Sequence, residues 1–232
     1  MLNIEQFRHG DNLAYLVYGN TQAIAVDGVS WQKILSFLEK NNLILSAVAN
    51  THQHFDHTSG NSHLLKATKA ELLTFATLTD GKEFNIDDEK ITVYRTPGHT
   101  DDSVCFSAGN ALLSGDTLFN ATIGNCFSGN LKSFYLSIKR LITLPNETII
   151  FAGHDYVRDS VTFARRLEPD NKEIEKFWNL YNPEYVYSTM ADERKINPYL
   201  RFNEEPIVNL LKKMNLPHDT EWERWQSLMS IE

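Results

Sequence analysis

The sequence predicts an α+β fold, in which a strand-rich first region is followed by a smaller helical region. Two observations lead to this prediction. Short apolar runs of strand length recur up to residue 153, and most of them end next to a polar residue or a glycine. Beyond Tyr156 the apolar residues follow a helical spacing instead, and five prolines separate the segments. We therefore expect two domains, at residues 1–157 and 158–232.

The first apolar runs predict a hairpin and a helix. Residues 13–26 contain two strand-like runs separated by Gly19-Asn20, a turn-forming pair. Residues 30–40 carry apolar side chains at helical spacing, which predicts a helix. Residues 43–49 form another strand-like run, which leads directly into a loop rich in histidine.

The elements that follow repeat this pattern of a strand that ends at a polar residue. We expect a helix at 61–69, strands at 71–75, 89–94, 110–115 and 148–153, and helices at 160–167, 171–181 and 205–214. His99, Asp116 and His154 follow three of these strands, and each adjoins a glycine that permits a tight turn. The ends of four strands therefore carry the parts of one candidate site.

The bulk composition is that of an ordinary globular protein of 232 residues, 42% hydrophobic and 22% charged. A formal net charge of −8 argues against nucleic acid or an anionic membrane as the main partner, because phosphate binding needs clustered Lys and Arg. No segment approaches the roughly 20 apolar residues that span a bilayer, and the start lacks signal-peptide features. Cys105 and Cys126 show no metal or disulfide spacing, so we expect a cytoplasmic protein.

Three histidines and an aspartate lie within the motif Thr51-His52-Gln53-His54-Phe55-Asp56-His57. Imidazole nitrogens and carboxylate oxygens are ligands that zinc, iron and manganese accept. Four such groups on one tight loop exceed what a single open tetrahedral ion needs, so we expect two metal ions. Each histidine taken alone would more often be an ordinary hydrogen-bonded residue, but the cluster favours a metal site.

The order of the motifs resembles that of the metallo-β-lactamase superfamily. After the 51–57 motif come Gly98-His99-Thr100, Gly115-Asp116 and Gly153-His154. The similarity continues through Asp155-Tyr156, residues 163–171 and residues 197–201, which makes the hydroxyacylglutathione hydrolase (glyoxalase II) family the most similar one. The resemblance implies an αββα sandwich with metals at the sheet edge, followed by a helical domain that helps to bind a thioester.

The resemblance also implies the ligands and the reaction. One metal would be held by His52, His54 and His99, the other by Asp56, His57 and His154, and Asp116 with a hydroxide would bridge them. Asp56 and Asp116 would be the catalytic carboxylates. Two divalent ions, zinc first with iron or manganese also suited, would activate water and polarise the acyl carbonyl of a thioester such as S-D-lactoylglutathione. A thiol has a pKa of about 8.5, so its thiolate leaves without a strong general acid.

The contacts expected for the thiol carrier are only partly present. The predicted substrate-binding residues are Asn125, Phe127, Tyr156 and Arg201. Asn125 stands where the family carries a basic residue for a glutathione carboxylate, and losing such a contact costs about 1.5–3 kcal/mol. Either Lys132 or another cation compensates, or the thiol carrier differs.

Several alternatives follow from the same motifs. Persulfide dioxygenases look similar around His52, His54 and His99 but use a single iron, which would leave Asp56, His57 and His154 without a metal. A nucleic-acid-cleaving enzyme disagrees with the net charge, and a secreted β-lactamase disagrees with the missing signal peptide. A non-catalytic metal-binding protein is the remaining alternative. We expect a monomer or weak oligomer that binds a small-molecule thioester, with no nucleic-acid or membrane partner.

Overall fold

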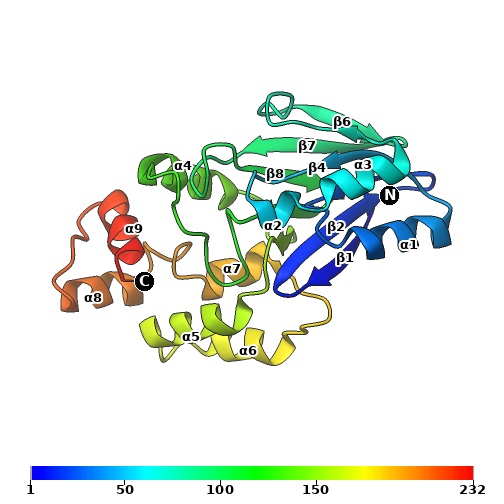
Figure 1. Ribbon diagram of the computed structural model, residues 1–232. Helices are drawn as coiled ribbons and strands as arrows, with labels where there is room; N and C mark the ends of the chain where they lie inside the picture. The colour runs from blue at the N-terminus through cyan, green and yellow to red at the C-terminus, as the bar shows by residue number, and fades with distance from the viewer. Residues whose placement is uncertain (1, 232) are drawn as a thin grey trace.

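A computed structural model describes residues 2–231 as two β-sheets packed face to face, with helices on the outer face of each sheet (Figure 1). The first sheet has the strand order β1 (Asn3–His9), β2 (Asn12–Tyr18), β3 (Gln22–Val26), β4 (Ile44–Ala49) and β5 (Glu71–Leu72). The second has the order β11 (Ser188–Thr189), β10 (Ile149–Ala152), β9 (Ala111–Gly115), β8 (Val104–Ala108), β7 (Glu89–Arg95) and β6 (Glu83–Ile86). The αββα sandwich expected from the sequence is confirmed.

Strand β2 has apolar side chains on both of its faces, and each face packs against a different layer. Leu13, Tyr15 and Val17 point into the core between the sheets, whereas Ala14 and Leu16 belong to the cluster under the outer helices. Both faces of the strand are therefore covered, so its apolar run is nearly continuous rather than alternating.

Helices cover the two outer faces. On the first sheet lie α1 (Trp31–Asn41) and α3 (Asn61–Thr68), which bury Ile34, Leu38 and Leu64. On the second sheet α4 (Leu131–Leu141) packs Phe134 and Ile138 in one cluster with residues of β8 and β9. Each helix thus turns its apolar stripe towards a sheet.

The helical region packs partly against the core between the sheets and partly against the apolar cluster outside the second sheet. It contains α5 (Val157–Leu167), α6 (Lys172–Leu180), α7 (Met190–Ile196), α8 (Glu205–Lys213) and α9 (Glu221–Met229). Trp225 of α9 is fully buried, and its ring centroid lies 5.8 Å from that of Phe134 in α4. The apolar core therefore runs from the sandwich into the helical region (Figure 1).

Several sequence predictions were wrong or incomplete. The opening hairpin is the second half of a three-strand meander, because β1 pairs antiparallel with β2. The strand expected at 71–75 is limited to Glu71–Leu72, and a strand does occur after residue 156, namely β11. Sequence analysis also missed β6, β8, α4, α7 and α9. β1 buries only Phe7, and β11 is a two-residue polar edge strand, so neither has a clear apolar period.

Glu193 of α7 ties the helical region to the loop after β9. It is fully buried, and its carboxylate accepts hydrogen bonds from the Ala121 N–H at 3.0 Å and from the Asn197 side-chain amide at 2.7 Å. Ala121 has a φ of 71°, which is uncommon for alanine. The hydrogen bond from its N–H to Glu193 helps to stabilise this conformation. Burial outweighs these donors and raises the pKa of Glu193 to about 7.

Glu193 therefore predicts a pH-dependent stability. Because the pKa is higher in the folded chain, this group favours folding below its usual pKa and loses that contribution as pH rises to about 7 and above. The loss amounts to at most about 3 kcal/mol. Glu193→Gln should remove the pH-dependent contribution of this carboxyl to stability. The unfolding free energies of wild type and variant would be measured in urea at pH 5 to 8. The wild-type value minus the variant value should fall as pH rises. A constant difference, as expected for the exposed control Glu184→Gln, would contradict the assignment.

Among residues 2–231, no helix is both long and apolar enough to cross a bilayer. Both cysteines are free thiols. Cys105 is buried in the second outer layer, and burial raises its pKa to about 11, which makes it an unreactive core residue. Cys126 is half-buried in the loop before α4.

Candidate metal centre

The 51–57 motif forms a loop that leaves β4 and turns into the short helix α2 (Phe55–Thr58). His52 lies in the loop and is buried, and His54 precedes the first turn of α2. Asp56 and His57 lie within that turn. The change from strand to helix over a few residues turns four candidate ligands towards one region.

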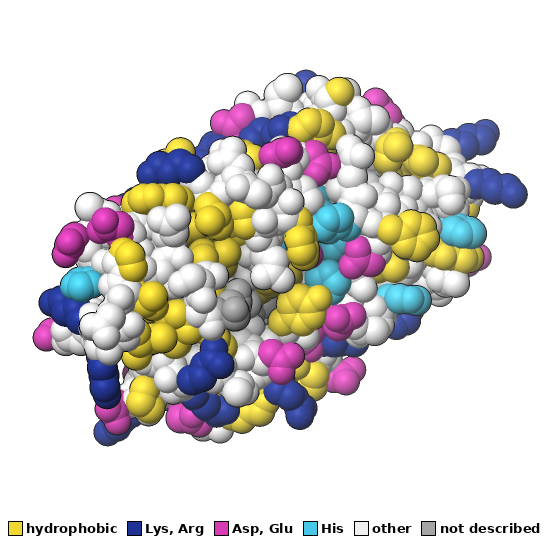
Figure 2. Space-filling model, turned by 60° about the vertical axis from the view of Figure 1, so that its left-hand side comes forward, with side chains coloured by type: hydrophobic (Ala, Val, Ile, Leu, Met, Phe, Trp, Pro, Cys, Tyr) yellow, Lys and Arg dark blue, Asp and Glu magenta, His cyan; other side chains and the backbone are white. Residues whose placement is uncertain are grey.

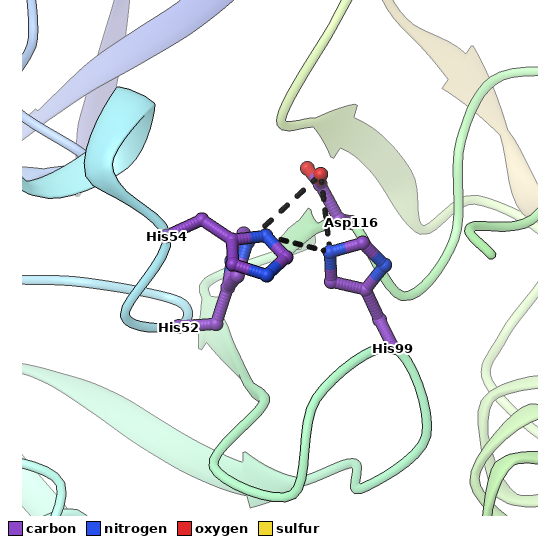
Figure 3. A group of neighbouring side chains, drawn as sticks. All are labelled: His52, His54, His99 and Asp116. Carbon is purple, nitrogen blue, oxygen red and sulfur yellow. Dashed lines mark hydrogen bonds and ion pairs between the residues drawn. The ribbon is translucent and has the colours of Figure 1, made fainter. Parts of the chain in front are cut away.

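Three histidines and Asp116 form the first group of candidate ligands (Figure 3). His54 Nδ1 lies 2.8 Å from His52 Nε2 and 3.1 Å from His99 Nε2. Asp116 Oδ2 lies 3.5 Å from His99 Nε2 and 3.9 Å from His52 Nε2. Figure 3 shows His52 and His54 on one loop, with the His99 ring and the Asp116 carboxylate converging on them from other parts of the chain.

Asp56, His57 and His154 form the second group. His57 Nε2 and His154 Nε2 lie 3.2 Å apart, and Asp56 Oδ2 lies 3.3 Å from His154 Nε2. Asn12 donates a hydrogen bond of 3.1 Å to Asp56 Oδ2 and so holds this half-exposed carboxylate in place.

Asp116 faces both groups. Its Oδ2 atom lies 3.5 Å from His99 Nε2 of the first group and 3.5 Å from His154 Nε2 of the second, and its Oδ1 atom lies 3.4 Å from His57 Nε2 of the second group. Oδ1 is buried and has no hydrogen-bond partner among residues 2–231. An orphaned carboxylate oxygen among converging imidazole nitrogens is what a metal ion would satisfy, so these residues fit a pair of divalent metals.

Two glycines allow Asp116 to reach this position. Gly115 has a φ of 50°, and a Cβ there would lie 2.5 Å from Thr51 Cβ. At Gly153 a Cβ would lie 2.1 Å from Asp116 Oδ1 and 2.9 Å from His57 Cε1. The backbones of β9 and β10 can therefore approach the ligands only without side chains at these points.

The Nδ1 atoms of His52 and His99 have oxygen partners, which fixes how these two rings are turned. Thr51 Oγ1 lies 3.1 Å from His52 Nδ1, and the Asn125 carbonyl lies 2.9 Å from His99 Nδ1. The remaining nitrogens of these rings are left to face the centre. Loop residues that looked like ordinary linkers in the sequence thus orient the candidate ligands.

Asp27 is the functional residue that sequence reasoning missed. Its buried carboxylate lies 3.0 Å from His57 Nδ1, and it accepts hydrogen bonds from the Thr51 N–H at 2.8 Å and Thr51 Oγ1 at 2.7 Å. It also has a φ of 53°. Its place directly after the β3 run was visible in the sequence, but only the parallel pairing of β3 with β4 brings it beneath the histidine loop.

The buried carboxylates of the centre favour the binding of positive charge. Burial, reinforced by His57, lowers the pKa of His52 to about 4, so its ring is a neutral ligand. Burial also acts to lower the pKa of His57, but the Asp27 and Asp116 carboxylates overcome it and raise that pKa to about 11. For Asp116 burial acts to raise the pKa, yet the surrounding histidines, His57 first, lower it far below its usual value. The buried carboxylates thus attract a cation, whether a proton or a metal.

Three of the four predicted substrate-binding residues lie at the centre. Tyr156 stacks on His154 with ring centroids 4.9 Å apart and an angle of 6°. Phe127 is 67% exposed and packs edge-on against His99 at 5.1 Å. Asn125 is exposed and joins the centre through its carbonyl. These three residues therefore border the two groups of candidate ligands.

Arg201 and Lys132 contact other parts of the fold, and a role of Arg201 in substrate binding stays a prediction. Arg201 makes two hydrogen bonds, of 2.8 and 2.9 Å, to the buried carboxylate of Glu168. Lys132 lies over the rings of Tyr135 and Trp222, 4.9 and 4.5 Å from their centroids. Both cations are engaged within the fold, because each meets a partner that the sequence could not reveal.

Two cavities flank the centre. The loop-side cavity, about 370 Å³, is lined by Asn50, His52, Gln53, Thr58, Asn61, Leu72, Leu73, Thr74, Phe75, Leu78 and Asp102. The helical-side cavity, about 300 Å³, is lined by Phe119, Thr122, Ile123, Asn125, Tyr156, Asp159, Ser160 and Phe163. On the face drawn in Figure 2 the histidines gather in a hollow bordered by hydrophobic and acidic side chains.

Comparisons with known proteins agree with this architecture. The family model described as "Metallo-beta-lactamase superfamily" matches residues 8–78 and 71–154, and that described as "Hydroxyacylglutathione hydrolase C-terminus" matches residues 155–230. Hydroxyacylglutathione hydrolase 1 of Vibrio vulnificus is 33% identical over 223 residues, covering 90% of this chain and 89% of that protein. The hydroxyacylglutathione hydrolase of Chromohalobacter salexigens is 31% identical over 230 residues, covering 90% of each.

Among solved structures, the crystal structure of ETHE1 from Myxococcus xanthus superimposes with a TM-score of 0.70 at 24% identity. The match covers 97% of this chain and 99% of that one. At this level of identity the likeness establishes the fold, which includes the helical region.

Proposed function

This chain belongs to the hydroxyacylglutathione hydrolase family of the metallo-beta-lactamase superfamily, and we propose from this premise that it is a metal-dependent hydrolase of acyl thioesters. The substrate we propose is a 2-hydroxyacyl thioester such as S-D-lactoylglutathione, cleaved to the hydroxy acid and a free thiol. One observation carries the proposal: two complete ligand groups share the carboxylate of Asp116.

We assign the ligands by these two groups. His52, His54 and His99 would hold one metal, Asp56, His57 and His154 the other, and Asp116 would be shared between them. Zinc is our first choice because mixed imidazole and carboxylate ligands suit it; iron and manganese accept the same donors. When bound, the two metals would supply an activated water as nucleophile and polarise the acyl carbonyl.

The chain's own residues would orient the reaction. Asp56 and Asp116 provide the negative charge that holds the metals, while Asp27 and Thr51 keep the rings of His57 and His52 turned towards the centre. Tyr156 and Phe127 would form aromatic walls on either side of the reacting group. No serine or cysteine nucleophile is needed, and the thiolate leaves without a strong acid.

Metal removal tests the proposal. The purified protein should contain two metals per chain by elemental analysis and should hydrolyse S-D-lactoylglutathione. Dialysis against a chelator should reduce activity at least about a hundredfold, since the nucleophile depends on the metals, and zinc should restore it. One iron per chain together with oxygen uptake on glutathione persulfide would instead favour a mononuclear dioxygenase.

The cellular setting is proposed from the same features. Two free cysteines and the absence of a membrane-spanning helix among residues 2–231 suit a cytoplasmic enzyme. The net charge of −8 suits a small-molecule substrate rather than nucleic acid. We propose a monomer or weak oligomer, because one chain carries both ligand groups.

A further inference from the structure

We propose that the helical-side cavity receives the thiol-carrier arm of the substrate and selects carriers that are uncharged or cationic over carriers that present a carboxylate. This inference rests on the proposed function, since it concerns the substrate of the same centre. It starts from the position of the cavity, which adjoins the metal centre at Tyr156 and Asn125 and extends along α5 through Asp159, Ser160 and Phe163.

The two cavities can be assigned to the two arms of a thioester. A carbonyl placed at the centre directs its acyl and thiol arms to opposite sides. The loop-side cavity is built entirely from residues 50–102, whereas the helical-side cavity is the one to which the helical region contributes. The helical region is also the part that matches the family model for the hydroxyacylglutathione hydrolase C-terminus, so we assign its cavity to the carrier.

The lining of the helical-side cavity is unsuited to an anion. Among its described lining residues none is Lys or Arg, and Asp159 is the charged one. Its polar groups are the neutral side chains of Thr122, Asn125, Tyr156 and Ser160, beside three aromatic or aliphatic residues. A carboxylate placed here would face Asp159 and would gain no charge-assisted hydrogen bond.

Three arginines of the surrounding segments have partners within the fold. Arg166 is one turn beyond Phe163 on α5, and its guanidinium lies over the Phe163 ring, 5.0 Å from the centroid. Arg201 is held by Glu168. Arg8 lies 2.7 Å from Asp155, the residue before Tyr156. Among the described residues that line the cavity, the one charged side chain is therefore the acidic Asp159.

A panel of thioesters with one acyl group tests the inference on the metal-loaded protein. The D-lactoyl group would be carried by glutathione, by glutathione amidated at its glycine carboxylate, by N-acetylcysteamine and by thiocholine. We expect kcat/KM to be about three- to tenfold higher for the amidated than for the unmodified glutathione thioester. The cationic thiocholine thioester should also exceed the uncharged N-acetylcysteamine thioester.

Two substitutions should change these ratios in opposite ways. Asn125→Lys should lower the KM for the unmodified glutathione thioester and reverse the preference between it and its amide. Asp159→Asn should abolish the advantage of thiocholine over N-acetylcysteamine. Asp170→Asn, an exposed acid that lies outside this cavity, is the matched control and should change neither ratio. Because each ratio compares two substrates on one variant, partial loss of active protein does not affect it.

The outcomes separate the inference from the proposed function. If unmodified S-D-lactoylglutathione is the best of the four substrates, the carrier inference is wrong and the hydrolase remains. Equal kcat/KM for the glutathione thioester and its amide also overturns the inference. If the metal-loaded protein hydrolyses none of the four, the proposed function fails and the carrier inference falls with it.

Discussion

Asp116→Ala is expected to abolish thioester hydrolysis and to release both metals. The carboxylate faces both ligand groups, with Oδ1 3.4 Å from His57 Nε2 and Oδ2 3.5 Å from His99 Nε2. Removing it deletes one ligand from each metal and one negative charge from a buried site. We expect kcat/KM to fall by at least about a thousandfold, together with a metal content well below two per chain by elemental analysis.

The conservative variant Asp116→Asn tests whether the charge of this side chain, rather than its shape, is needed for activity. It keeps the volume of the side chain but replaces one oxygen by an NH₂ group that cannot bind a metal. We expect it to lose activity almost as fully as the alanine variant while retaining a native far-UV circular dichroism spectrum. Asp101→Asn, an exposed aspartate two residues from His99, is the control and should behave like wild type. Full activity with two metals in Asp116→Ala would refute the ligand assignment.

Asp27→Asn is expected to weaken the second metal group and the fold together. Asp27 touches none of the proposed metals, but its carboxylate receives the Thr51 N–H and hydroxyl and lies 3.0 Å from His57 Nδ1. Such partners of a ligating histidine typically contribute 10- to 100-fold to metal affinity, so we expect a loss of about that size, measured by competition with a chromophoric chelator. Unfolding free energy should fall by about 2–4 kcal/mol, because a buried acceptor network is broken.

Asn is the informative substitution because it tolerates the left-handed conformation that residue 27 adopts. The change therefore tests the charge of Asp27 rather than its backbone. Asp87→Asn is a close control: Asp87 also has a positive φ and accepts hydrogen bonds from Thr21 and Asn20, but it lies in a turn away from the centre. It should leave metal affinity unchanged. If Asp27→Asn also leaves metal affinity unchanged, Asp27 does not position His57.

Much of the fold could be predicted because its strongest signals are local. β2, β3, β4 and α1 each have a clear apolar pattern, and the structure confirms them. The edge strand β1 and the two-residue strand β11 escaped prediction, because their formation depends on pairing with β2 and β10 rather than on their own apolar content.

The candidate site was predictable for a similar reason. His52, His54, Asp56 and His57 are neighbours in the sequence, and His99, Asp116 and His154 each follow a strand, so their order alone suggested a shared centre. The carrier side was less predictable. Arg201 is predicted to contact substrate, but its guanidinium donates to Glu168, a residue 33 positions away, and the sequence gives no sign of that pairing.

The sequence by itself determined the two-part fold, the residue types of the metal centre and the family, because these depend on local patterns and on the order of motifs along the chain. Only the tertiary structure decided that Asp116 lies within 3.5 Å of histidines from both groups, that Asp27 contacts His57, and that Arg201 contacts Glu168 while Lys132 lies over aromatic rings. The physical reason is that these contacts join strands and helices distant in sequence, and their distances are set by sheet pairing and core packing rather than by any local signal.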